Sequence, residues 1–295
     1  MVNYLGDRIK ELREKYALSQ KDISKNICSQ AFISKIEKGN VFPSADILIK
    51  LADRLCIDIS FLLDTSNTPR HEYTVETFSQ IREAVSKRDY KLVREIIKAE
   101  KDNKLFSDNK LQQFFVWHEA ICSYYEDKNF SRSLTYLDQA LNLTSLDRKV
   151  HSEREVEILI SKGNILTDNK KINEALNVYK DALEYLAYLP NIQNKFVPIR
   201  LYYNYSRALR DNEDFLESIK ACQKGIRLTE KHSLLYLKGD LYFQIGLNYK
   251  LLNDYQNSLD NFNRSRMIYQ LESNERMLNL VDLNLKELEA SSKIR

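Results

Sequence analysis

Apolar residues in the first 64 positions recur every three or four residues, which is the spacing of helices that bury one face. A first helix is predicted from Tyr4 to about Tyr16. A fourth helix is expected after Ser44, which can act as its N-cap. The inner faces of these two helices hold Leu5, Ile9 and Leu12, and Ile47, Leu48, Leu51 and Leu55. Residues 57–63 predict a short fifth helix that closes the unit.

Between these helices, the pattern predicts two further short helices joined by a tight turn. Ser19 can cap the earlier one, with Asp22 three residues later, and Ile23 and Ile27 share its inner face. Two helices of this length with a short turn between them are typical of units that read DNA.

Cys28 and Ser29 are expected to form the turn, and Ser29 can cap the next helix. Ile33 and Ile36 point inward in that helix, and Gly39 ends it where a left-handed backbone is favoured. The outward positions hold residue types that reach base edges and phosphates, namely Gln30, Ala31, Ser34, Lys35 and Lys38.

Residues 4–64 resemble the XRE or lambda-repressor-like family of helix-turn-helix domains. The resemblance rests on Leu-Ser-Gln at 18–20, Ile-Ser-Lys-Ile-Glu-Lys-Gly at 33–39, Pro-Ser at 43–44 and Leu-Ile-Lys-Leu-Ala at 48–52. The turn at residues 27–29 is one residue shorter than usual. Gln30 can bond adenine, Lys35 can reach guanine, and Ala31 can meet a thymine methyl. The candidate DNA-binding residues are Arg13, Gln20, Ser29, Gln30, Ala31, Ser34, Lys35, Lys38 and Asn40. The alternative is a helix pair used only for packing.

Beyond residue 73, one short pattern recurs five times. In each copy, a polar residue is followed directly by an apolar residue, and a small or β-branched residue stands three positions after the apolar one. These small or β-branched residues are at 93, 133, 175, 218 and 258. The steps are 40, 42, 43 and 40 residues. A period in this range predicts stacked helical hairpins.

The repeats resemble tetratricopeptide units, which carry Trp, Leu-Gly and Tyr on one helix and small, aromatic and small residues on the next. One copy has Gly163 followed by Ala175, Tyr179 and Ala182, and another has Gly246 followed by Ser258, Phe262 and Ser265. Small residues are needed because two helices cannot approach closely around a large side chain.

The expected fold is all-α, with an N-terminal lambda-repressor-like helix-turn-helix domain and a C-terminal tetratricopeptide-repeat right-handed solenoid. The expected boundaries are 1–64 for the DNA-binding domain, 65–73 for a linker, 74–272 for five repeats and 273–295 for a capping helix.

The resemblance places the second, fifth, sixth, ninth and twelfth residues of each first helix on the concave side of the solenoid. An Asn amide there can both donate to and accept from the backbone of an extended peptide. The candidate peptide-binding residues are Asn164, Tyr203, Asn204, Arg207, Phe243, Gln244 and Arg276. The two arginines can pair with a carboxylate. The alternative is that these side chains are solvated or bridge neighbouring repeats.

An XRE-type domain followed by about five long repeats resembles the RNPP family of quorum-sensing regulators, in particular its PlcR-like members, which share the short turn and the pair Tyr203-Asn204. The resemblance implies a homodimer that binds a near-palindromic operator on double-stranded DNA and a short signalling peptide. It carries peptide-holding roles over to Asn164, Asn204 and Gln244. Arg276 stands where these members have an aromatic residue, which leaves the identity of the peptide open.

Composition adds little to this interpretation. The net charge of +3 does not by itself indicate nucleic-acid binding, but residues 8–38 hold eight Lys and Arg against four acidic residues. The four cysteines and four histidines are scattered, so no metal and no cofactor is expected. Six glycines leave little room for a phosphate-binding loop, so the chain is not expected to be an enzyme.

The N-terminus has no signal-peptide pattern and no apolar run is long enough to span a membrane, so a cytoplasmic protein without a membrane partner is expected. Two alternatives stay open. One is a repeat-scaffold regulator that senses a metabolite or an oxidant, with Cys28 as the candidate thiol. The other is a protein that sequesters a protein partner.

Overall fold

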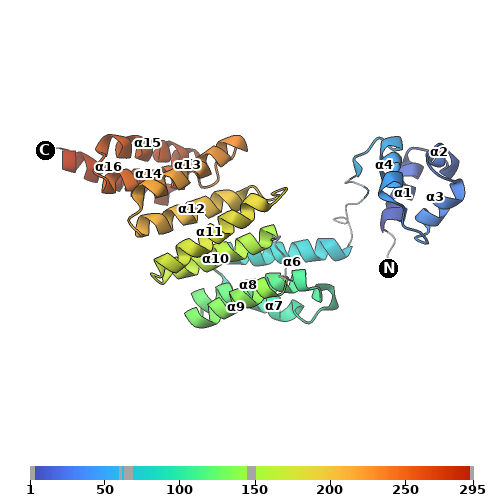
Figure 1. Cartoon of the computed structure of the whole chain (residues 1–295), viewed down its shortest axis with the longest axis horizontal. Coiled ribbons are helices and arrows are strands. Elements are labelled where there is room, and N and C mark those ends of the chain that lie inside the picture. Colours follow the sequence, from blue (N-terminus) through green and yellow to red (C-terminus); the bar gives the residue numbers. More distant parts are fainter. Residues whose placement is uncertain (1–3, 60–61, 63–68, 145–150, 293–295) are drawn as a thin grey trace. The chain divides into compact units, whose positions relative to one another are not determined.

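The computed structural model describes residues 4–59, 62, 69–144 and 151–292 (Figure 1). Within these ranges every regular element is a helix. The chain divides into two compact units, Met1–Glu83 and Ala84–Arg295. None of the helices in the described ranges combines the length and apolarity needed to cross a bilayer.

Residues 4–54 of the first unit form four short helices around one apolar core. They are α1 (Tyr4–Lys15), α2 (Gln20–Ser24), α3 (Gln30–Glu37) and α4 (Ala45–Arg54). The core residues that are at most 1% exposed include Ile9, Ile23, Ile33, Ile36, Leu51 and Leu55. Leu62 joins this core, and Ile59 and Leu62 are helical. The predicted fifth helix is therefore confirmed at those two positions and was wrong for Ile57 and Asp58, which are not helical. Residues 60, 61 and 63 lie outside the described residues.

The helix ends follow the predicted caps with two corrections. Ser19 and Asp22 form a reciprocal capping box, and the Ser29 hydroxyl accepts from the Phe32 N–H. Ser44 occupies the N-cap position of α4, but its side chain makes no capping bond, so that expectation was wrong. Helix α2 ends at Ser24, so Ile27 belongs to the turn rather than to the helix.

The shortened turn works because Asn26 adopts a left-handed backbone, with φ of 63°. Asn is one of the few non-glycine residues that take this conformation at low cost. Gly39 has φ of 72° after α3, as predicted. Cys28 and Ile27 still pack against the core of the unit.

Helix α6 (Pro69–Ser86) begins earlier than the sequence pattern suggests. Proline is favoured in the first turn of a helix, because its missing N–H would have no partner there anyway. Residues 69–73, which fall in the predicted linker 65–73, are therefore helical. Residues 65–68 lie outside the described residues.

The second unit continues as helical hairpins with the predicted register. In chain order the elements are α7 (Tyr90–Glu100), the 3₁₀ turn η1 (Lys104–Phe106), α8 (Asn109–Tyr125), α9 (Phe130–Asn142), α10 (Glu153–Asp168), α11 (Ile172–Tyr188), α12 (Phe196–Asp211), α13 (Phe215–Lys231), α14 (Lys238–Leu251), α15 (Tyr255–Leu271) and α16 (Glu275–Ser292). Helix α16 packs on α15, so it takes the predicted capping position. It begins at Glu275 rather than at residue 273.

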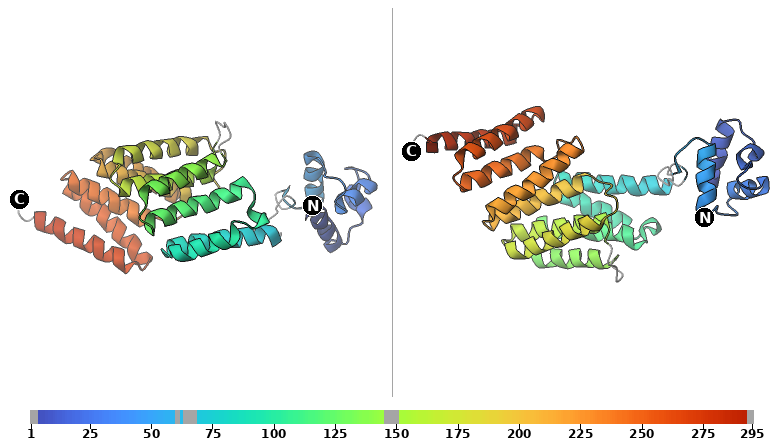
Figure 2. Two further views of the ribbon diagram at one scale, coloured as in Figure 1. Left: turned by 90° about the horizontal axis from the view of Figure 1, so that it is seen from below. Right: turned by 45° about the horizontal axis from the view of Figure 1, so that its top comes forward.

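The hairpins stack one on another along the chain (Figure 2), and contacts between successive first helices join these helices into one layer. Helix α8 contacts α10, α10 contacts α12, and α12 contacts α14. We call α8, α10, α12 and α14 the A-helix layer. The second helices α9, α11 and α13 each contact both their own first helix and the next one along the chain.

The small residues of the repeat pattern lie where helices touch. A Cβ on Gly163 would lie 2.5 Å from the Tyr179 ring, and one on Gly246 would lie 2.7 Å from the Phe262 ring. Ser258 is fully buried, and its hydroxyl donates to the Gly246 carbonyl at 2.8 Å. The predicted reason for the small residues, close helix approach, is thereby confirmed.

Candidate DNA-binding surface and peptide-binding face

Helix α3 presents the predicted DNA-reading residues to the outside of the first unit. Gln30, Ala31, Lys35 and Lys38 are exposed, and Ser34 is half-buried. Ser29 and Asn40 flank the helix and are also exposed. The opposite side of α3 is fixed by Ile33 and Ile36, which are at most 1% exposed. A helix anchored in this way can present its outer face to a groove without rearranging.

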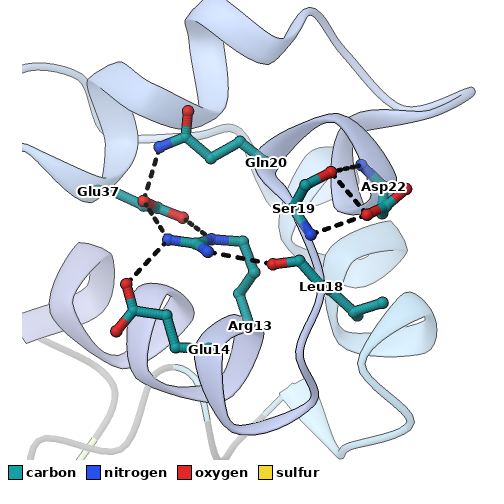
Figure 3. A network of polar contacts seen from close by, with 7 residues as sticks. All are labelled: Arg13, Glu14, Leu18, Ser19, Gln20, Asp22 and Glu37. Atoms are coloured by element: carbon teal, nitrogen blue, oxygen red, sulfur yellow. Dashed lines mark hydrogen bonds and ion pairs between the residues drawn. The ribbon is translucent and has the colours of Figure 1, made fainter.

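Arg13 and Gln20 both converge on Glu37 at the end of α3 (Figure 3). Arg13 Nε lies 2.7 Å from Glu37 Oε1, and Arg13 Nη2 lies 3.1 Å from Oε2. Gln20 Nε2 donates to Glu37 Oε2 at 2.8 Å. The hydrogen bonds to Glu37 raise the pKa of Arg13 above its ordinary value. Both side chains therefore position α1, α2 and α3, and their contact with phosphates stays a prediction.

Arg54 is a second support that the sequence interpretation missed. Its Nη1 donates to the Asp22 carbonyl at 2.7 Å, and its Nη2 donates to the Lys25 carbonyl at 2.9 Å. These bonds hold the end of α2 and the start of the turn. Its place in the last turn of α4 was the only signal in the sequence, and that signal does not reveal a partner 32 residues away.

Six of the seven predicted peptide-binding residues lie on the A-helix layer. Asn164 belongs to α10, Tyr203, Asn204 and Arg207 to α12, and Phe243 and Gln244 to α14. Arg276 lies on α16 and is exposed. Its place on α16, outside the A-helix layer, separates it in the chain order from the other six, and its contact with a peptide stays a prediction.

Asn204 has the features expected of a side chain that receives a ligand. It is only 6% exposed, yet its amide has no hydrogen-bond partner among the described residues. Asn164 is half-buried, and its Oδ1 accepts from the Tyr179 hydroxyl at 2.7 Å. That bond orients the Asn164 amide and leaves its Nδ2 donors for another acceptor.

Gln244 is 3% exposed and only half satisfied. Its Oε1 accepts from Arg210 Nη1 at 2.8 Å, while Nε2 is buried without a partner among the residues that the structure describes. Arg210 also pairs with Asp211 at 2.7 Å. Arg210 thus sets the orientation of the Gln244 amide and leaves the Gln244 Nε2 donors available to a ligand. An unpaired buried donor typically costs about 1–3 kcal/mol.

Tyr203, Arg207 and Phe243 surround these amides. The Arg207 guanidinium lies 5.9 Å from the centre of the Tyr203 ring, and no acidic side chain pairs with it in the described part of the chain. Burial raises the pKa of the Tyr203 hydroxyl. The Phe243 ring packs against Phe262 at 5.4 Å between centres, so Phe243 is partly a core residue.

The candidates from the sequence omit the second repeat position of α10, α12 and α14. It holds Glu157, Arg200 and Asp240. Arg200 Nη2 pairs with Glu157 at 2.8 Å, which links α10 to α12. Asp240 is half-buried on α14, and burial raises its pKa. Counting the same repeat register through each helix would have found all three.

Two pockets lie between first and second helices, away from the predicted peptide-binding residues. One, of about 450 Å³, has Tyr242 and Tyr249 among its lining residues, together with Arg227 and Arg264. The other, of about 420 Å³, includes Tyr205, Lys180 and Glu217. None of the predicted peptide-binding residues lines either pocket.

The cysteines differ from one another in burial. Cys122 and Cys222 are buried, which raises the pKa of each to about 12, and burial also raises the pKa of Cys28. Cys56 is exposed, and Cys28 is half-buried. A thiol with a raised pKa forms less of the reactive thiolate. No cluster of three or more metal-ligating side chains occurs within the described ranges.

Comparison with known proteins matches both units. The sequence profile of the RNPP family C-terminal domain covers residues 78–287, and a helix-turn-helix profile covers residues 9–62. A comparison with curated protein sequences gave no significant match.

Three solved structures illustrate the similarity in fold. PlcR of Bacillus thuringiensis, in complex with the peptide PapR7 and DNA, is 24% identical, with a TM-score of 0.78 over 95% of this chain and 99% of that one. The SHP pheromone receptor Rgg2 of Streptococcus dysgalactiae is 17% identical, with a TM-score of 0.65 over 96% and 99%. ComR of S. thermophilus, in complex with DNA and its signalling peptide ComS, is 15% identical, with a TM-score of 0.63 over 97% and 99%.

The RNPP profile spans more than half of the chain, from α6 to α16, and the helix-turn-helix profile precedes it in the sequence. The protein is therefore a member of the RNPP family.

Proposed function

We propose that this protein is a homodimeric, sequence-specific DNA-binding transcription regulator whose activity is set by a short signalling peptide bound on the A-helix layer. The observation that carries the peptide half is the state of Asn204 and Gln244. Both are more than nine-tenths buried, yet polar atoms of both lack partners among the described residues. Such groups are stable in a fold when a ligand completes them.

The DNA half rests on α3. Its exposed Gln30 can make two hydrogen bonds with adenine, and its exposed lysines can reach guanine or phosphates. Solved structures of PlcR and ComR contain both DNA and a peptide, which supports the same two ligands here.

Two-fold symmetry gives the mechanism a geometric requirement. A dimer that places two copies of α3 in successive major grooves needs them roughly 34 Å apart, and it therefore favours a near-palindromic operator. To move the population from mostly inactive to mostly active, the peptide must bind one state about 5 kcal/mol more tightly than the other. We propose that the peptide does this by changing the spacing of the two DNA-binding units.

The test uses the full-length protein and two unbiased ligand sources. Selection from a pool of random duplexes should enrich a near-palindromic sequence, and sedimentation should show two chains per operator. Selection from a pool of random short peptides should retain a defined subset, and that subset should change operator affinity. Failure to enrich any duplex would refute the DNA half, and failure to retain any peptide would refute the peptide half.

The other possibilities have less support. Burial lowers the reactivity of Cys28, Cys122 and Cys222, which disfavours an oxidant sensor built on them. RNPP proteins are a regulatory family, and no constellation in the described residues leads us to assign a reaction to this chain.

A further inference from the structure

Two side chains of opposite charge, Arg207 and Asp240, flank Tyr203 on the A-helix layer, and among the described residues neither forms an ion pair. Arg207 on α12 is half-buried and contacts the face of the Tyr203 ring. Asp240 on α14 is half-buried and lies close enough to Tyr203 to contribute to its raised pKa. In the described part of the chain, no acidic side chain pairs with Arg207 and no basic side chain pairs with Asp240.

Other charged residues of the same repeat register are paired. Arg200 is bound to Glu157 at 2.8 Å, Arg210 to Asp211 at 2.7 Å, and Lys250 to Glu287 at 2.5 Å. The fold therefore neutralises charges at this face where a partner is within reach. Partial burial removes some of the water around an unpaired charge, so a ligand group of opposite charge would bind it more favourably than it would a fully solvated side chain.

Among the residues that the structure describes, no cation forms an ion pair with Asp240. Its nearest recorded neighbours are the Tyr269 hydroxyl, Tyr203 and the carboxylate of Glu272. Burial raises the pKa of Asp240, and it also raises the pKa of Glu272, to which the negative charge of Asp240 contributes. A ligand cation beside Asp240 would offset the desolvation of its carboxylate and weaken its repulsion from Glu272.

The register gives the separation of the two charges. Arg207 is the ninth residue of its repeat and Asp240 is the second of the next, so they differ by seven helix positions, or about 10 Å along the helix axis. Neighbouring helices lie about 8–10 Å apart. The two backbone positions are therefore about 14 Å apart, which an extended peptide spans with about four residues. Asn204 and Gln244 occupy the sixth position of these same two helices, between the charges in register.

We propose that Arg207 and Asp240 select and orient the ligand. The peptide presents a carboxylate to Arg207 and a cationic group to Asp240, about four residues apart, while Asn204 and Gln244 bind its backbone. Each charge on the peptide can come from a side chain or from a free terminus. The inference rests on the proposed function and specifies its ligand class, because it excludes peptides that lack either charge.

The test uses defined pools of synthetic heptapeptides with the full-length protein. One pool carries Lys and Glu four positions apart, a second carries the same two residues in reverse order, and three more replace Lys, Glu or both with Gln. Every pool is made with free termini and again with acetylated and amidated termini, which separates terminal charges from side-chain charges. Binding is measured by affinity selection and mass spectrometry.

One order of charges should be retained at least about tenfold better than the fully neutral, end-blocked pool, which is the usual scale of a charge-assisted contact. Asp240→Asn should abolish the preference for the cation and keep the preference for the carboxylate. Arg207→Gln should do the reverse, and Arg207→Lys should keep the carboxylate preference in part. Arg227→Gln on α13, an exposed arginine outside the A-helix layer, should change nothing.

The failures are distinguishable. Peptides retained without regard to charge, or a preference that survives both Asp240→Asn and Arg207→Gln in variants with wild-type circular dichroism, would overturn this inference and leave peptide binding intact. If no peptide is retained from any pool, the proposed peptide control is wrong and this inference falls with it.

Discussion

Glu37 and Arg13 form a two-point ion pair across 24 residues of sequence, with N–O distances of 2.7 and 3.1 Å. Their side chains are only 5% and 12% exposed. Glu37 lies on the last turn of α3, so the pair ties the end of the proposed DNA-reading helix to α1. The orientation of α3 therefore depends on a residue that itself faces the protein.

Replacing Glu37 tests this support. Glu37→Gln leaves the Arg13 charge largely buried without its counter-ion, so we expect the free energy of unfolding of the first unit to fall by about 2–3 kcal/mol. Urea unfolding followed by circular dichroism measures the change. Glu14→Gln is the matched control, because Glu14 also contacts Arg13 but is 57% exposed. Its effect should be at most about 0.5 kcal/mol, and equal effects for the two variants would contradict the assignment.

The outward residues of α3 should divide into two kinds. Gln30→Ala should cost about 1–3 kcal/mol on the selected operator and relax its sequence preference, because a base contact is lost. Lys38→Ala should weaken binding to all sequences alike and lower the salt dependence by about one counter-ion, because a phosphate contact is lost. Titrations at several salt concentrations on operator and scrambled DNA distinguish the two. An unchanged sequence preference in Gln30→Ala would remove it from base reading.

Asn204 and Asn248 provide a matched pair of buried amides on the A-helix layer. Asn204 has no partner among the described residues, whereas Asn248 Nδ2 donates to Ser218 at 2.8 Å. Asn204→Ala should leave the melting temperature of the free protein within about 1 °C of wild type and weaken binding of the best-retained peptide at least about tenfold. Asn248→Ala should lower the free energy of unfolding by about 1 kcal/mol and keep peptide affinity.

Asp240 should make stability depend on pH. Burial raises the pKa of Asp240, so the folded protein binds its proton more tightly than the unfolded chain does. Stability is therefore lost as pH rises from the ordinary pKa of 3.8 through the higher folded value. Asp240→Asn should raise the melting temperature by about 1–2 °C at pH 7, and the gain should vanish below pH 3.8. Asp260→Asn, at an exposed position on α15, should show no gain at either pH.

The close helix approach at Gly163 should make Gly163→Ala destabilising, although Ala ordinarily stabilises a helix more than Gly does. Gly→Ala within a helix normally stabilises by up to about 1 kcal/mol, but a Cβ here would lie 2.5 Å from the Tyr179 ring. Gly163→Ala should therefore lower the free energy of unfolding by about 2 kcal/mol, measured by the fluorescence of Trp117. Gly225→Ala should cost less, because its nearest neighbour is the flexible end of Leu241 at 3.0 Å. A stabilised Gly163→Ala would show that the two helices can separate freely.

The sequence predicted the helical fold and the repeat register correctly. The apolar spacing predicted the helices of the first unit, and the positions of small residues predicted the hairpins, because a helix interface admits only small side chains where backbones meet. The failures occurred at element ends. The side chain of Ser44 makes no capping bond, Ile27 lies in the turn, and α6 extends back to Pro69. Local sequence leaves such positions nearly balanced between helix and loop.

For the candidate sites too, the sequence determined some features and the tertiary structure determined others. Helical periodicity in the sequence determined which residues face outward on α3, and the resemblance to tetratricopeptide repeats placed six of the seven peptide-binding candidates on the A-helix layer. Only the tertiary structure decided that Arg13 and Gln20 bind Glu37 and that Gln244 is oriented by Arg210. It also decided that, in the described part of the chain, the Asn204 amide has no hydrogen-bond partner and neither Arg207 nor Asp240 has an oppositely charged partner. Periodicity fixes the direction of a side chain, but its hydrogen-bond partner comes from another helix, and that pairing exists only after the helices have packed.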